Sequence, residues 1–155
     1  MKWIDGTDID LKQFSGEALC EKLALDMYKG DRDAWECPEF LQLAMALLNF
    51  DAEISMEGFV APHSGNLTAG DYAQIIAAFR AIGDEQDAEI LEKALQFDAR
   101  YTKMIAEAKE GSERINLSDT LFEIMMDLEQ ELYPSTDLDI WSMLYSYLDA
   151  QIKAL

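Results

Sequence analysis

Apolar residues recur at intervals of three and four along almost the whole chain, and this spacing constrains the fold more than any other feature. It is the repeat of one face of an α-helix, whereas a half-buried strand would alternate strictly between apolar and polar residues. No alternating run is long enough to predict a strand. Glycine and proline, which interrupt regular structure, occur only 8 and 3 times in 155 residues. The sequence therefore predicts an all-α fold.

Capping residues divide this pattern into about six helices. The predicted helices begin, in order, at or near Ser15, Pro38, Gly70, Asp84, Ser118 and Thr136. Ser15, Asp84 and Ser118 are typical N-caps, Gly83 is typical of the position after a helix end, and Pro134 cannot continue a helix. The fourth helix is expected to stop near Gly111. One long loop, 55–70, separates the second helix from the third. The length suits a single helical domain over residues 1–155.

The net charge of −19 restricts the partners of this chain. A field of this sign repels nucleic acid and anionic lipid and attracts basic surfaces. We therefore expect a basic protein partner, with no direct binding to nucleic acid or to a membrane. The N-terminus becomes polar at once, and no run approaches the ~18 apolar residues that would span a bilayer. These features predict a cytoplasmic protein.

Catalytic and metal-binding patterns are missing from the sequence. A di-iron bundle needs Glu-x-x-His pairs, and a hydrolase triad is expected to show a Gly-x-Ser-x-Gly elbow. The chain has one histidine, His63, in the long loop, and neither pattern. It also lacks a glycine-rich phosphate loop, and neither Cys20 nor Cys37 is accompanied by other residues at the spacing of a metal site. We predict no enzymatic activity, no catalytic residues, no metal and no cofactor.

Acidic residues are concentrated in parts of the chain. Residues 33–79 and 115–152 contain no Lys or Arg. In the predicted fifth helix Asp119, Glu123, Asp127 and Glu131 lie four residues apart, which places them on one face with a rise of about 6 Å per step. Each like-charge neighbour costs roughly 0.2–0.5 kcal/mol, so helix stability does not explain the row.

Two explanations of this acidic row are open. Basic side chains of the preceding helix and linker could neutralise it, namely Arg100, Lys103, Lys109 and Arg114. Alternatively the row is a partner-binding surface that imitates the charge of a duplex, which basic proteins recognise with Lys and Arg. The second explanation predicts partner contacts through Asp119, Glu123, Asp127 and Glu131, together with Asp84, Glu85 and Glu89 near the start of the fourth helix.

Short motifs in the middle of the chain resemble a known family. The sequence reads Glu57-Gly58-Phe59, then 70–73 as Gly-Asp-Tyr-Ala, then 78–83 as Ala-Phe-Arg-Ala-Ile-Gly. This resembles the bacterial DNA-mimic protein family, whose motif is an Asn-Gly-Gly-Phe loop followed by Ser-Gly-Asp-Tyr-Ala. Residues 144–148 look like its closing helix. Met56 and Glu57 stand where the family has Asn and Gly, and the loop 60–69 is longer.

The resemblance implies an acidic helical protein that occupies the DNA-binding surface of a basic partner, such as a transcriptional repressor. Our first hypothesis is therefore a sequestering DNA mimic. The alternative is an immunity protein that blocks a basic toxin such as a nuclease. An enzyme that uses carboxylates is a third hypothesis, which metal binding in the His63 loop would support. The oligomeric state stays open, a homodimer included.

Overall fold

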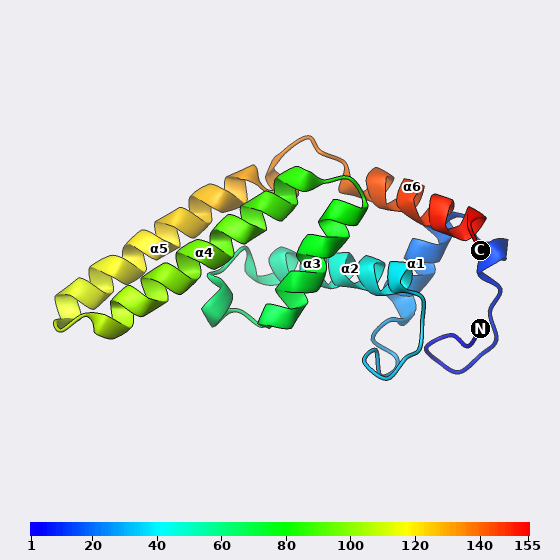
Figure 1. Cartoon of the computed structure of the whole chain (residues 1–155), viewed down its shortest axis with the longest axis horizontal. Coiled ribbons are helices and arrows are strands. Elements are labelled where there is room, and N and C mark those ends of the chain that lie inside the picture. The colour runs from blue at the N-terminus through cyan, green and yellow to red at the C-terminus, as the bar shows by residue number, and fades with distance from the viewer.

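The computed structural model describes residues 1–155 and confirms the all-α prediction. Six α-helices and three short 3-10 helices make up the fold, and the only β-type pairing is an isolated bridge between Lys2 and Asp8. The elements, in order, are η1 (Leu11–Gln13), α1 (Gly16–Asp26), α2 (Glu39–Glu57), η2 (Pro62–Ser64), α3 (Ala69–Ala81), α4 (Glu85–Glu107), α5 (Gly111–Glu131), η3 (Tyr133–Ser135) and α6 (Ile140–Lys153) (Figure 1).

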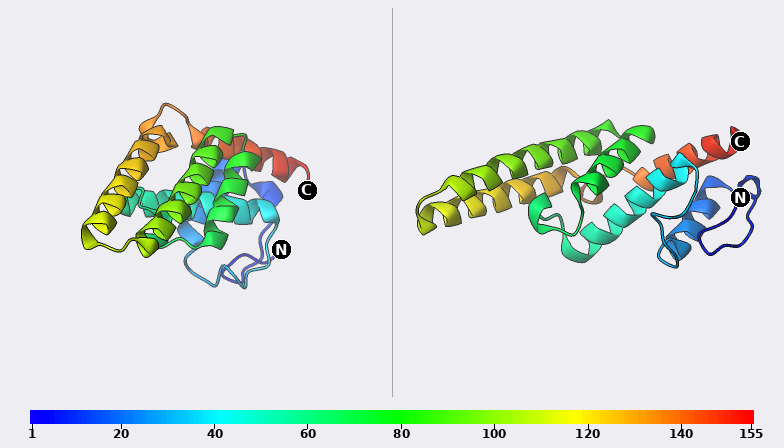
Figure 2. Two further views of the ribbon diagram at one scale, coloured as in Figure 1. Left: turned by 60° about the vertical axis from the view of Figure 1, so that its left-hand side comes forward. Right: turned by 60° about the horizontal axis from the view of Figure 1, so that its bottom comes forward.

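The helices pack in sequence-adjacent pairs, except at the ends of the chain. Helix α2 packs against α3, α3 against α4, and α4 along α5, while α1 packs against α6. The antiparallel α4–α5 pair forms a long arm that projects from the rest of the molecule (Figures 1 and 2). We call this pair, residues 85–131, the α4–α5 arm.

One cluster of 31 buried apolar residues forms the core. At its centre the ring of Phe79 lies 5.9 Å from that of Phe50 and 6.0 Å from that of Tyr133. The core does not reach the end of the arm. The last buried residue of α4 is Asp98, and the first of α5 is Leu121. The far half of the arm is therefore held by contact between two helices, with its other sides exposed.

Several predicted helix ends are confirmed. Ser15 accepts a hydrogen bond from the backbone N–H of Ala18 at 3.1 Å, and Asp84 accepts one from that of Asp87 at 3.1 Å. Gly83 follows α3 with a φ of 93°, a left-handed conformation that favours glycine. The loop predicted between the second and third helices is also present, although α2 continues to Glu57 before it begins.

The predicted starts of the last two helices are wrong. Helix α5 begins at Gly111, so Ser118 lies inside it and caps nothing. Residues 111–117 have few apolar side chains, but helix growth adds one hydrogen bond per residue once a turn exists, and α4 supplies a surface to pack on. Helix α6 begins at Ile140 with Asp139 as its cap, because Pro134 and Thr136 belong to η3 and the turn after it.

The N-terminal segment is anchored to α1 by a buried carboxylate. Asp26 accepts a hydrogen bond from Trp3 Nε1 at 2.9 Å and ion pairs with Lys22 and Lys29, each at 3.0 Å. The hydrogen bonds from Lys29, Lys22 and Trp3 lower the pKa of Asp26 to about 2. This contact places Trp3 in the core, where it is 1% exposed.

A bilayer crossing needs about 20 apolar residues in a row, and no helix of this chain meets that requirement.

Candidate partner-binding surface

The acidic row on α5 is exposed over its whole length. The side chains of Asp119, Glu123, Asp127 and Glu131 all point away from the core, and the apolar residues of α5 that face α4 are buried. The row spans three steps of four residues, or about 18 Å along the helix axis. It lies on an arm that stands clear of the rest of the fold (Figure 2).

None of the four carboxylates in this row forms an ion pair with the protein's own cations. The six salt bridges of the chain lie elsewhere. Arg114 donates to the backbone oxygen of Ala108 at 2.9 Å, and the Arg100 guanidinium lies over the Tyr101 ring at 5.7 Å. Lys103 and Lys109 form no salt bridge. Direct neutralisation by these four cations, one of the two explanations of the row, is therefore not found.

The acidic residues at the start of α4 have three different environments. Asp84 is only 3% exposed and caps the helix, so it does not belong to a partner-binding surface and that prediction is corrected. Glu85 is exposed but pairs with Arg80 at 3.0 Å, and Arg80 also pairs with Glu92 at 2.7 Å. Only Glu89 is exposed and free of ion pairs. Of the seven carboxylates predicted to bind a partner, the four of the α5 row and Glu89 are therefore exposed and unpaired; Glu107, Glu110 and Glu113 add further unpaired carboxylates near the tip of the arm.

Asp84 shares its buried site with a second carboxyl group. Asp87 is 1% exposed, and one of its oxygens accepts a hydrogen bond from the backbone N–H of Tyr133 at 3.0 Å. The other oxygen of each aspartate is buried without a partner of its own. Burial first, and the neighbouring Asp84 second, raise the pKa of Asp87 to about 8. Asp87 therefore holds a proton at neutral pH, and its hydrogen bond from Tyr133 joins the start of α4 to η3, directly after α5.

The single histidine has a structural contact. His63 Nδ1 lies 2.5 Å from Asp98 Oδ1, and the other oxygen of Asp98 accepts the backbone N–H of His63 at 3.0 Å. Asp98 is the last buried residue of α4, so this pair ties the loop between α2 and α3 to the arm. No nucleophile is hydrogen-bonded to the imidazole, and no three His, Cys, Asp or Glu side chains are grouped to hold a metal ion. Burial raises the pKa of Cys20 to about 11, which leaves its thiol unreactive.

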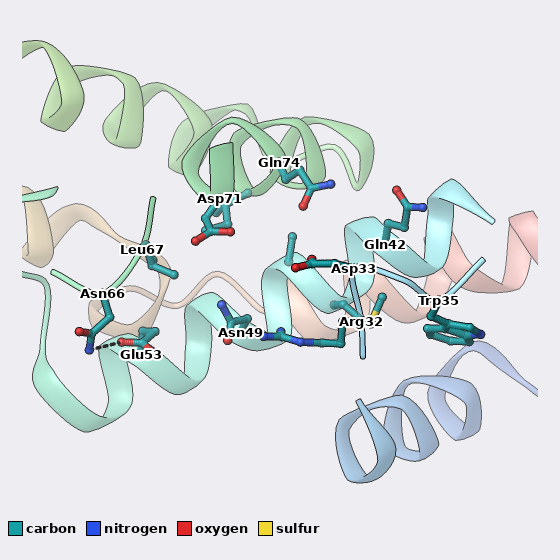
Figure 3. Close-up of a pocket in the computed structure, with 13 residues that line it drawn as sticks. Arg32, Asp33, Trp35, Gln42, Asn49, Glu53, Asn66, Leu67, Asp71 and Gln74 are labelled. Atoms are coloured by element: carbon teal, nitrogen blue, oxygen red, sulfur yellow. Dashed lines mark hydrogen bonds between the residues drawn. The ribbon is translucent and has the colours of Figure 1, made fainter. Parts of the chain in front are cut away.

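A polar groove of about 390 Å³ lies between α2, α3 and the loop that follows α1 (Figure 3). Several polar side chains around it already form hydrogen bonds, whereas Arg32, Asp33 and Gln74 form none. Asp71 accepts the N–H of Thr68 at 2.9 Å, and Glu53 accepts from Asn66 at 3.3 Å. Asn49, also in the groove, accepts a hydrogen bond from Tyr28. The three side chains without hydrogen bonds include one cation and one anion and so favour no single class of ligand, whereas the α5 face carries charge of one sign; the α5 face is the stronger candidate site.

The structure also shows a feature that was not predicted from the sequence. Ile115, Phe122 and Met126 of α5 are 62%, 65% and 49% exposed, although they are large and apolar. They lie seven and four residues apart, which are intervals of two turns and one turn, so they form a stripe along one side of the helix. The signal was present in the sequence, since these residues are out of phase with the buried Leu121, Met125 and Leu128.

Comparison with known proteins gave one match. The family model described as DMP19-like protein matches residues 36–151, which is most of the chain. The match covers α2 to most of α6, including the whole α4–α5 arm. No curated protein matched, and no solved structure matched either.

Proposed function

Because the chain belongs to the DMP19-like family, which is a family of DNA-mimic proteins, we propose that it sequesters a basic, DNA-binding protein by presenting the charge of a duplex. We also propose that it acts by binding, without enzymatic activity. The observation that carries the proposal is the row of four exposed carboxylates on α5, none of which is paired with a cation of the chain itself.

The arm suits a protein that must enter a nucleic-acid site. A duplex carries one charge per roughly 1.7 Å of its axis, and DNA-binding proteins line up Lys and Arg to match it. The α5 row has one charge per about 6 Å, so it is sparser than a duplex but fixed on a rigid helix. Since its carboxylates are free, a partner would gain charge-assisted hydrogen bonds without first breaking ion pairs.

The proposal predicts that neutralising the row will weaken binding. In a variant with Asp119→Asn, Glu123→Gln, Asp127→Asn and Glu131→Gln, we expect affinity for the basic partner to fall between about fourfold and several hundredfold, since exposed ion pairs contribute roughly 0.2–1 kcal/mol each. The partner is first captured from cell extract at low salt on the immobilised wild-type chain. Its dissociation constant is then measured with purified proteins as salt is raised and as duplex DNA is added.

A control variant separates the row from the total charge. Glu17→Gln, Glu21→Gln, Glu36→Gln and Glu39→Gln make the same change in net charge at exposed residues in α1, at the start of α2 and in the loop before it, all outside the arm. None of these carboxylates forms a salt bridge. We expect this control to bind nearly as tightly as the wild type. Equal losses in both variants, or binding that resists both salt and duplex DNA, would contradict the proposal.

A further inference from the structure

The apolar stripe of α5, defined by Ile115, Phe122 and Met126, has no packing partner in the fold. Side chains of this size contribute most to stability when buried, yet each is about half exposed or more. They do not belong to the buried face of α5, which consists of Leu121, Met125 and Leu128. Isolated exposed apolar residues are ordinary, but three aligned on one side of a projecting helix are a feature of interaction surfaces.

Carboxylates border this stripe. Asp119 lies between Ile115 and Phe122 along the helix, while Glu123 and Asp127 directly follow Phe122 and Met126. With 3.6 residues per turn, each of these carboxylates lies beside the stripe and on the same side of it. The exposed side of α5 is therefore an acidic row next to an apolar stripe.

The charge next to the stripe decides what kind of molecule can cover it. A second copy of the chain, placed stripe to stripe, would bring two sets of unpaired carboxylates together, and each chain carries a net charge of −19. A simple polycation would pair with the row and leave the stripe in water. A surface with Lys or Arg along one edge and apolar side chains beside them matches both parts of α5.

We propose that α5 docks an amphipathic basic surface, a helix with cations on one side and apolar residues next to them, and that the apolar stripe supplies the part of the affinity that salt does not weaken. The inference rests on the proposed function, since it names the chemistry of the same partner. Electrostatic contacts weaken as salt screens them, whereas apolar burial persists. The acidic row attracts the basic partner, and the stripe discriminates among basic surfaces.

Two synthetic helical peptides test this inference. Both carry the same Lys and Arg residues, and they differ only in having Leu or Gln at the adjacent positions. We expect the wild-type chain to bind the Leu peptide at least tenfold more tightly than the Gln peptide, measured by fluorescence anisotropy over a range of salt. In a variant with Phe122→Gln and Met126→Gln, the preference should fall below about twofold while the salt dependence stays unchanged.

A matched control uses exposed apolar residues outside the arm. Leu25→Gln and Met56→Gln change residues that are 74% and 83% exposed, on α1 and α2, and should preserve the preference. Equal affinity of the wild type for both peptides would overturn the inference. So would concentration-dependent self-association that Phe122→Gln and Met126→Gln abolish, because the stripe would then be a junction between copies. A third outcome separates the two ideas. If the wild type prefers the Leu peptide, and the variant with a neutralised acidic row binds both peptides as tightly as the wild type, the result would support the stripe and contradict the proposed function.

Discussion

Replacing Asp87 with Asn is expected to stabilise the protein by several kcal/mol above pH 8 and by progressively less as the pH falls. The carboxyl group of Asp87 is buried beside Asp84, and its pKa is raised to about 8 from an ordinary value of 3.8. A difference of one pKa unit between the folded and unfolded states changes the free energy of unfolding by about 1.4 kcal/mol. An asparagine in the same position can still accept the backbone N–H of Tyr133 and can donate to Asp84 without carrying a charge.

The sign of this effect follows from the direction of the pKa shift. Between about pH 4 and pH 8 the folded protein binds the proton of Asp87 and the unfolded chain does not. The free energy of unfolding of the wild type therefore falls as the pH rises through this range, and it levels off above it. The asparagine side chain does not titrate, so the Asp87→Asn variant lacks this part of the pH dependence. The advantage of the variant is consequently largest at alkaline pH.

Thermal or urea unfolding from pH 5 to pH 9 measures the effect. For a chain of this length 1 kcal/mol shifts the melting temperature by roughly 2–4 °C, so the difference at pH 9 should be about 10 °C. Asp137→Asn is the control, because it makes the same chemical substitution at an exposed residue without a salt bridge. A wild-type stability that does not change over this range would show that Asp87 does not hold a buried proton in the folded protein.

Replacing Gly16 with Ala is expected to destabilise the protein by about 3 kcal/mol or more. Gly16 is the first residue of α1, at the point where α1 crosses α6. A Cβ atom there would lie 2.1 Å from the backbone oxygen of Tyr145 and 3.0 Å from the backbone nitrogen of Asp149. Backbone atoms cannot rotate away, so the two helices must separate. That movement would also stretch the 2.6 Å hydrogen bond from the N–H of Gly16 to Asp149 Oδ1. Overpacking costs about 1–3 kcal/mol, and a hydrogen bond to a charged group contributes about 1.5–3 kcal/mol.

Gly111→Ala is the matched control for this prediction. Gly111 is likewise the first residue of a helix and has an ordinary negative φ, but its added Cβ would meet only the end of the Arg114 side chain at 3.9 Å. Since alanine restricts the unfolded chain more than glycine does, the control should be neutral or about 0.4–1 kcal/mol more stable. Urea unfolding of both variants gives the comparison. Equal stabilities would mean that α1 and α6 can shift without cost.

Of the candidate site, the sequence predicted the position of the acidic row on one side of a helix but not whether its carboxylates are paired. Spacing by four placed Asp119, Glu123, Asp127 and Glu131 on one side of a helix, because helical geometry is local. Whether they were paired with cations depended on contacts between elements, and the structure shows that they are not. Asp84 illustrates the opposite case. Its position as a cap was correctly predicted, but its burial depends on packing between elements, which no local pattern encodes.

The helical class, most of the helices and the presence of a strongly acidic helix face followed from sequence patterns, because periodicity, capping and composition act within a few residues. Only the packing of distant elements establishes which carboxylates are unpaired, that Asp87 is buried with a raised pKa, and that Gly16 has no room for a side chain. These properties arise where elements far apart in the sequence meet, as Gly16 meets Tyr145 and Asp87 meets Tyr133. Burial and the local dielectric, which fix the charge of a carboxyl group, exist only after that packing.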